Sequence, residues 1–221
     1  KKIILYFHND PLSMNGSSTV GDRIKLLNKI DKILFNSKWS QERFFIGIDN
    51  KVLLKQKTSV CYQSTNRFKV DFKKKENLIS FVGKLNNAKG YDIFGKAIIK
   101  VLDKYSNWKA VVIGDEPREK IFFKHKNLSI KGYTKHEEVL KILNRVSISV
   151  VCSRWEEPFG RTSLEAASRG CAVIISNRGG LPETTKNAIV LDEISSKNLF
   201  SKIEKLILNK NELKKSQRLN Y

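Results

Sequence analysis

The sequence predicts an α/β protein with parallel β-sheets of Rossmann type. Short, continuously apolar runs of strand length alternate with segments of helical spacing along most of the chain. Such runs are typical of parallel strands that are buried on both faces and covered by helices. The 221 residues are 40% hydrophobic and 29% charged, which is ordinary for a globular protein with a sizeable core.

The first part of the chain is predicted to form a βαβα unit. Its expected elements are a strand at 3–8, a helix at 23–30, a strand at 31–37 and a helix at 38–48, with a polar, turn-rich loop at 9–22. Residues 51–76 lose this alternation and become polar and basic, so we interpret them as a linker. The change in pattern predicts two parts, residues 1–70 and residues 71–221.

Regular alternation resumes in the second part. The expected strands are 78–83, 109–114, 127–132, 147–153, 171–176 and 188–191, and the expected helices are 91–104, 135–145, 161–169 and 195–208. Parallel sheets of this type bind ligands at the carboxyl ends of their strands. The loops that follow residues 83 and 153 are therefore the first candidates for a site.

Basic residues outnumber acidic ones by 42 to 22, which gives a net charge of +20. Three interpretations are open: a lysine-rich surface without a specific partner, contact with an anionic membrane surface, or a nucleic-acid partner. Nucleic acid is the least favoured, because the chain has no helix-turn-helix, zinc or RNA-binding signature. No apolar run approaches the length of a membrane span, and no signal peptide is visible. The three cysteines are an odd number without metal-ligand spacing, and Cys152 and Cys171 lie in apolar runs. Buried thiols of this kind suit a reducing compartment, so we expect a cytoplasmic protein, with peripheral contact to the inner membrane face left open.

One stretch, SRWEEPFGRTSLEAASRG at 153–170, combines two carboxylates with the expected start of a helix. Pro158 and Gly160 place Glu157 on a loop, and the helix that follows places Glu165 about one turn inside. The exposed amide groups of a helix N-terminus attract anions. Carboxylates beside such a terminus predict a ligand that is part phosphate and part polyol.

A second loop, GKLNNAKG at 83–90, leaves another expected strand end and carries two lysines. The ammonium groups of Lys84 and Lys89 suit a diphosphate at this position. A metal centre is not indicated, since the chain has no Asp-x-Asp pair and its three histidines lack zinc-ligand spacing. We therefore expect neither a metal nor a cofactor.

These motifs, taken in order, resemble family 4 of the retaining glycosyltransferases with the GT-B fold. The matching segments are VGKLNNAKG (82–90), HEEVLKILNRVSISVVCS (136–153), EPFGRTSLEA (157–166), which holds an E-x7-E pair, and GGLPE (179–183). The segments ILYFHNDP and DKILFNSKWSQERF resemble the last third of that family's N-terminal domain. The resemblance implies that residues 1–70 are the remnant of an acceptor-side domain and that residues 71–221 are the nucleotide-sugar-binding domain.

The resemblance also implies roles for the matching carboxylates and amides. Glu165 would hold the ribose hydroxyls of a nucleotide sugar, and Glu157 would contact the hydroxyls of the transferred sugar. Backbone amides would bind the sugar hydroxyls and, at the helix start, the phosphates. The residues that supply these amides are Phe159, Gly160, Arg161 and Thr162.

The basic pair of the family falls on Lys84 and Lys89, which would neutralise the leaving diphosphate. The first of these positions is usually Arg in the family, and a lysine is a point charge rather than a bidentate fork. Gly83, directly before this pair, is a further match. Gly132 and Tyr133 belong to the GYT loop, which would hold the base, and His8 matches a histidine that would face the donor sugar.

The function implied by the resemblance is transfer of a sugar, with retention of anomeric configuration, from a nucleotide-diphosphate donor to a glycan or lipid-linked acceptor. One alternative is a nucleotide-sugar-binding module without turnover, because most of the acceptor domain is missing from the match. A nucleotide-sugar epimerase of the same architecture is a more distant alternative, which the E-x7-E loop disfavours. A basic nucleic-acid binder is the last.

Overall fold

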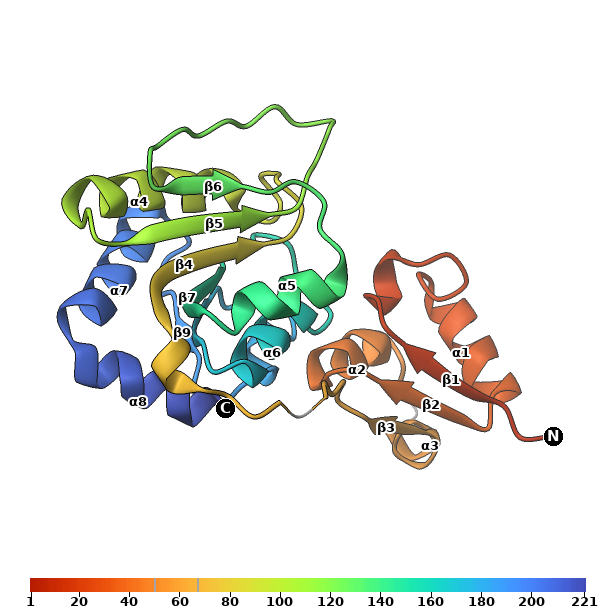
Figure 1. The fold of residues 1–221 in the computed structure, drawn as a ribbon. Coiled ribbons are helices and arrows are strands. Elements are labelled where there is room, and N and C mark those ends of the chain that lie inside the picture. Colours follow the sequence, from red (N-terminus) through yellow and green to blue (C-terminus); the bar gives the residue numbers. More distant parts are fainter. Residues whose placement is uncertain (50, 67) are drawn as a thin grey trace.

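The computed structural model describes residues 1–49, 51–66 and 68–221, and these residues form two parallel β-sheets. Figure 1 shows the smaller sheet and its helices on one side and the larger sheet, with helices on both faces, on the other. The α/β class with parallel sheets, predicted from the alternation of apolar runs and helical segments, is confirmed.

The smaller sheet has three parallel strands in the order β1-β2-β3. Its strands are β1 (Ile4–Phe7), β2 (Lys32–Phe35) and β3 (Thr58–Val60), and its helices are α1 (Val20–Lys29), α2 (Lys38–Phe45) and α3 (Lys51–Lys57), with a 3-10 turn η1 (Pro11–Ser13). The side chain of Thr19 caps α1 by accepting from the amide of Asp22, so this helix begins three residues earlier than expected. Phe7, Phe35 and Phe44 pack together in the core of the smaller sheet, with ring centroids 5.2–5.6 Å apart.

The interpretation of residues 51–76 as a linker is wrong for its first ten residues, which form α3 and β3. Leu54 is 2% exposed and joins the core of the smaller sheet. The Lys57 ammonium donates to the carbonyls of Leu27 (2.6 Å) and Ile30 (3.1 Å) at the end of α1. In the sequence, the lysines of α3 look like solvated surface charges. The short helix was therefore missed, because the groups that it packs against lie far away along the chain. Arg67, which also falls in the stretch, lies outside the described residues.

The larger sheet has six parallel strands in the order β6-β5-β4-β7-β8-β9. Its strands are β4 (Glu76–Val82), β5 (Lys109–Ile113), β6 (Leu128–Ile130), β7 (Val146–Val151), β8 (Ala172–Ile175) and β9 (Ile189–Val190). Its helices are α4 (Tyr91–Lys104), α5 (His136–Leu143), α6 (Arg161–Ser168), α7 (Ser196–Leu208) and α8 (Lys210–Asn220), with 3-10 turns η2 (Phe72–Lys74) and η3 (Leu181–Glu183). Every strand and helix expected in this part is present, and α8 is an element that the sequence reasoning did not identify.

Alternate residues of each central strand face opposite layers of helices. On β4, for example, Ile79 and Phe81 pack with α4 and α7, whereas Leu78 and Val82 contact the cluster that includes α5 and α6. The same alternation holds in β5 and β8, which explains why these strands read as continuous apolar runs. The arrowheads of β4 and β5 point toward the smaller sheet (Figure 1), so the carboxyl ends of these strands face it.

Helix α2 makes the principal contact between the two sheets. The Glu183 carboxylate accepts from the amides of Lys38 (2.7 Å) and Trp39 (2.9 Å) at the start of this helix. The hydroxyl of Ser37, its N-cap residue, donates to the carbonyl of Pro158 (2.5 Å). A carboxylate at a helix N-terminus satisfies orphan amide donors and complements the helix dipole. This contact holds the ends of β1 and β2 against the loop that carries Glu157.

In the described part of the chain, no helix combines the length and the apolar character needed to cross a membrane.

Candidate functional site

A cleft of about 430 Å³ lies where the carboxyl ends of strands from both sheets meet. It is lined by His8, Asn9, Asn36, Gln63, Phe81, Val82, Gly83, Lys89, Val151, Ser153 and residues 157–162. His8 and Asn36 directly follow β1 and β2, while Gly83 and Ser153 lie at the ends of β4 and β7. Eight of the predicted site residues are therefore gathered here: His8, Gly83, Lys89, Glu157, Phe159, Gly160, Arg161 and Thr162.

The start of α6 forms one wall of the cleft. Gly160 is its N-cap residue, with φ +104°, and a Cβ added there would lie 2.3 Å from Leu181 Cδ2, so only glycine fits. The first backbone bonds of the helix are donated by Ser163 and Leu164 to the carbonyl of Gly160. The amides of Arg161 and Thr162 precede these bonds and lie at the positive end of the helix dipole. An anion in the cleft would meet them there.

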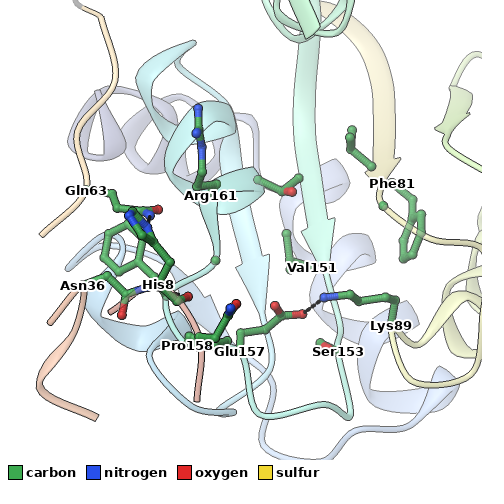
Figure 2. Close-up of a pocket in the computed structure, with 16 residues that line it drawn as sticks. His8, Asn36, Gln63, Phe81, Lys89, Val151, Ser153, Glu157, Pro158 and Arg161 are labelled. Atoms are coloured by element: carbon green, nitrogen blue, oxygen red, sulfur yellow. Dashed lines mark hydrogen bonds and ion pairs between the residues drawn. The ribbon is translucent and has the colours of Figure 1, made fainter. Parts of the chain in front are cut away.

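Lys89 and Glu157 form an ion pair inside the cleft (Figure 2), with the ammonium contacting Glu157 Oε1. Their side chains are 30% and 12% exposed, so the pair is largely shielded from water. The amide of Lys89 donates to Asn86 Oδ1 (2.9 Å), which fixes the backbone of this loop. The two charged groups that the sequence places on separate loops are thus direct neighbours.

The pair of glycines in GGLPE supports the Glu157 loop from behind. Gly179 has φ +59°, and a Cβ there would lie 2.1 Å from the carbonyl oxygen of Glu157. The amide of Gly180 donates to that same oxygen (2.6 Å), and the amide of Gly179 donates to Glu156 Oε2 (2.5 Å). Because the backbones approach this closely, residues with side chains cannot replace Gly179 without moving the loop.

The smaller sheet contributes polar groups to the opposite side of the cleft. His8 is exposed, its Nδ1 lies 2.8 Å from Gln63 Nε2, and its carbonyl accepts from Asn36 Nδ2 (3.1 Å). Figure 2 shows His8, Asn36 and Gln63 clustered together. Asn36 and Gln63 were not predicted. His8 was expected from the family resemblance alone; the rule that ligands bind at strand ends would have indicated Asn36, which directly follows β2, whereas Gln63 falls in the stretch interpreted as a linker.

Glu165 is 7% exposed, yet it is not among the residues that line the cleft. Its Oε1 accepts from the Arg161 guanidinium (3.2 and 3.3 Å) and lies 3.0 Å from His136 Nε2. His136 opens the segment 136–153 that matches the family, but no sequence signal pairs it with Glu165. The expected role of Glu165 in holding a ribose stays a prediction.

Three predicted residues, Lys84, Gly132 and Tyr133, also lie outside the cleft lining. They follow β4 and β6, whose carboxyl ends share one edge of the sheet. Tyr133 is 81% exposed, and the carbonyl of Gly132 accepts from the amide of Gly114 (2.8 Å). Lys84 is exposed. These residues extend the row of strand ends beyond the cleft, and their roles stay predictions.

Glu116 lies near this row and is held by an arginine. Arg118 Nε donates to its Oε1 (2.7 Å) and Arg118 Nη2 to its Oε2 (2.9 Å). The hydrogen bonds from Arg118 lower the pKa of Glu116 to about 2, and the charge of Lys84 adds a smaller effect in the same direction. Glu116 therefore stays ionised throughout the physiological range.

Among residues 1–49, 51–66 and 68–221, no group of three or more His, Cys, Asp and Glu side chains is placed to hold a metal ion. The expectation that the protein needs no metal or cofactor stays a prediction.

Two parallel sheets whose strand ends face a common cleft define an α/β protein of the GT-B type. Comparisons with known proteins agree with this architecture. The structure superposes on the crystal structure of HepE from Anabaena in complex with UDP and glucose, with a TM-score of 0.77 and 16% identity, covering 100% of this chain and 66% of that one. At this identity the likeness concerns the fold.

The sequence comparisons define the family. Residues 63–221 match the family model of the glycosyl transferases group 1, so the chain belongs to this family. The C-terminal domain of LpcC, a group 1 glycosyl transferase family protein from Francisella tularensis, is 29% identical with a TM-score of 0.60, covering 67% of this chain and 85% of that one. An uncharacterized 42.6 kDa protein in the cps region of Klebsiella pneumoniae is 26% identical over 168 residues, 68% of this chain. This chain spans 43% of the length of that relative.

Proposed function

We propose that this chain is the donor-binding part of a retaining glycosyltransferase of family 4. Glu157 and Glu165 would be the E-x7-E pair of that family. The observation that carries the proposal is the Lys89–Glu157 ion pair in front of the α6 N-terminus, at the carboxyl ends of strands from both sheets. A cation and free amides suit a diphosphate, whereas a carboxylate suits sugar hydroxyls.

The donor is proposed to follow the row of strand ends. Its phosphates would lie at the α6 amides and at Lys89, and its ribose would reach Glu165 once the carboxylate exchanges a partner. Tyr133 would lie near the base, and Glu157 would accept from the sugar hydroxyls opposite His8. This arrangement leaves Asn36 and Gln63, on the side of the smaller sheet, free to meet an acceptor.

The proposed reaction breaks the bond between the anomeric carbon and the phosphate oxygen. The bonding electrons leave with the nucleoside diphosphate, whose charge Lys89 and the α6 amides stabilise. The acceptor oxygen forms the new bond on the same face of the sugar, which retains the anomeric configuration. The acceptor proton passes to the departing phosphate, so the products are a glycoside and a nucleoside diphosphate.

The transferred group is proposed to be a hexose or related sugar, and the acceptor a glycan or lipid-linked glycan. Because the HepE structure contains UDP and glucose, UDP is the first nucleotide to test. The net charge of +20 supports peripheral binding to an anionic membrane surface on the cytoplasmic side. Equal, salt-independent binding to neutral and acidic vesicles would contradict that membrane contact.

The decisive measurement is a thermal-shift titration with UDP, GDP, ADP and their sugars. We expect one nucleotide to raise the Tm of the wild type, because a ligand that binds the folded state stabilises it. Glu165→Ala should lose most of this response, whereas Glu42→Ala, at an exposed position of helix α2, should keep it. No response to any nucleotide would contradict the proposal. Binding without sugar transfer to any added glycan would instead favour a binding module without turnover.

A further inference from the structure

A second hollow, of about 620 Å³, adjoins the cleft; we call it the side hollow. Asn9, Lys89, Glu157 and Pro158 line both spaces. A ligand in the side hollow therefore reaches the Lys89–Glu157 pair, whereas residues 159–162 at the start of α6 line only the cleft. Its remaining wall comes from Trp155 and from the loop after β1, between residues 10 and 15.

Trp155 is the largest side chain of the side hollow and is 51% exposed. Its amide donates to the carbonyl of Ala88 (3.0 Å), and so does the amide of Arg154 (2.9 Å). The Arg154 guanidinium is bound to both carboxylate oxygens of Asp92 (2.6 and 2.8 Å) and to the carbonyl of Asn87 (2.6 Å). The backbone below the indole is thus fixed, although the indole itself is open to solvent. An aromatic side chain on a fixed backbone has only two side-chain torsions to order, so it loses little entropy when a ligand covers it.

The polar groups of the side hollow are mainly neutral. The carboxylate of Asp10 is bound by Arg43 (2.9 and 3.2 Å) and by the amide of Leu12 (3.0 Å), and Lys89 is bound by Glu157. The charges that reach this space are therefore already paired. What remains is the hydroxyl of Ser13, which already donates to the carbonyl of Asp10 (3.0 Å), and the amide side chains of Asn9 and Asn15, which both donate and accept hydrogen bonds.

Neutral amides beside an aromatic face match the chemistry of a carbohydrate. A sugar ring presents hydroxyls around its edge, which pair with amides, and a C–H face, which packs on an aromatic ring. A phosphate or other anion would find no unpaired cation in this wall among the residues that the structure describes.

We propose that the side hollow binds the acceptor saccharide, with one of its rings stacked on the indole of Trp155 and one hydroxyl directed toward the Lys89–Glu157 wall. This inference rests on the proposed function and adds to it a location for the acceptor and a specificity-determining residue, Trp155. The subsite takes residues from both sheets, so it exists only while the two are held together.

The test uses saturation-transfer NMR with maltose and N,N′-diacetylchitobiose as probes, in the presence of UDP. We expect at least one disaccharide to bind the wild type and Trp155→Ala to weaken that binding about tenfold, the size of a lost aromatic contact. Trp155→Phe keeps an aromatic face and should restore most of the affinity. The matched control is Phe122→Ala, an aromatic residue that is 80% exposed and lines neither space.

UDP affinity, measured in parallel, separates this inference from the proposed function. If UDP binds and neither disaccharide does, or if Trp155→Ala binds the disaccharide as the wild type does, the acceptor subsite is refuted while the donor site stands. If UDP does not bind but disaccharide binding depends on Trp155, the proposed function fails and the saccharide site stands. An equal loss in Phe122→Ala would also refute the role of Trp155.

Discussion

Lys89 and Glu157 neutralise each other in the cleft. A ligand that binds either side chain must therefore replace the other as its partner. A diphosphate would draw the ammonium away, and sugar hydroxyls would then replace it as partners of the carboxylate. Neither group is left buried with an unpaired charge in the absence of ligand, which would be strongly destabilising. The same logic applies to Glu165, whose carboxylate is already in contact with Arg161 and His136; under the proposed function a ribose would displace one of these partners.

The cysteines permit a test at the level of single residues. Burial raises the pKa of Cys152 to about 12 and that of Cys171 to about 11, whereas Cys61 is exposed. Since the thiolate is the reactive form, we expect only Cys61 to react with Ellman's reagent within minutes at pH 8. All three should react in urea. Fast reaction of Cys152 in the folded protein would show that the carboxyl end of β7, beneath the cleft, opens readily.

At the scale of elements, one lysine joins two helix ends to a strand. The sequence shows KKK at 73–75 as a uniform basic run, but Lys75 is half-buried and burial lowers its pKa. Its ammonium donates to the carbonyls of Leu143 (3.1 Å), Val146 (2.7 Å) and Arg169 (2.6 Å). Leu143 ends α5, and Arg169 is the C-cap residue of α6. The lysine thereby satisfies carbonyls that helix ends leave without a partner.

Lys75→Met should therefore lower the free energy of unfolding by about 3 kcal/mol, because three largely buried carbonyls lose a charged donor. Urea denaturation followed by circular dichroism measures this change. The matched control is Lys74→Met, whose side chain is 78% exposed. Its effect should stay within about 0.5 kcal/mol. Equal effects of the two substitutions would show that the buried hydrogen bonds contribute nothing.

At the scale of the whole molecule, the cleft depends on the contact between the two sheets. Glu183 lies 144 and 145 positions from the two amides that it binds, and Pro158 lies 121 positions from Ser37. These long-range contacts bring His8 and Gln63 to the side of the cleft opposite Lys89. The motif GGLPE thus serves two purposes, since its glycines support the Glu157 loop and its glutamate binds the smaller sheet.

Glu183→Ala should loosen this contact without unfolding either sheet. The amides of Lys38 and Trp39 would lose their acceptor, and we expect their hydrogen exchange to accelerate about tenfold, in line with the loss of a helix cap. Hydrogen exchange followed by mass spectrometry on the peptide containing α2 measures this. Glu193→Ala, at an exposed position, is the control. Unchanged protection of α2 in Glu183→Ala would mean that other contacts hold the sheets together.

The sequence by itself determined the class of fold and most of its elements. Strand β8, for instance, is an unbroken apolar run because both of its faces are covered, and helix α4 occupies the predicted residues 91–104. Such signals are local: they depend on burial patterns within a few turns or one strand. The loop that places Glu157 before α6 is equally local, since Pro158 and Gly160 are adjacent to it.

Only the tertiary structure decided which side chains meet. The pairing of Lys89 with Glu157, of Glu165 with His136, and of the α2 amides with Glu183 joins residues that no periodicity relates. The short elements α3 and β3 were missed for the same reason, because their stability comes from packing against distant parts of the chain rather than from their own pattern. A local pattern predicts an element and the edge of the sheet where a site can lie, whereas the site itself is made by contacts across the fold.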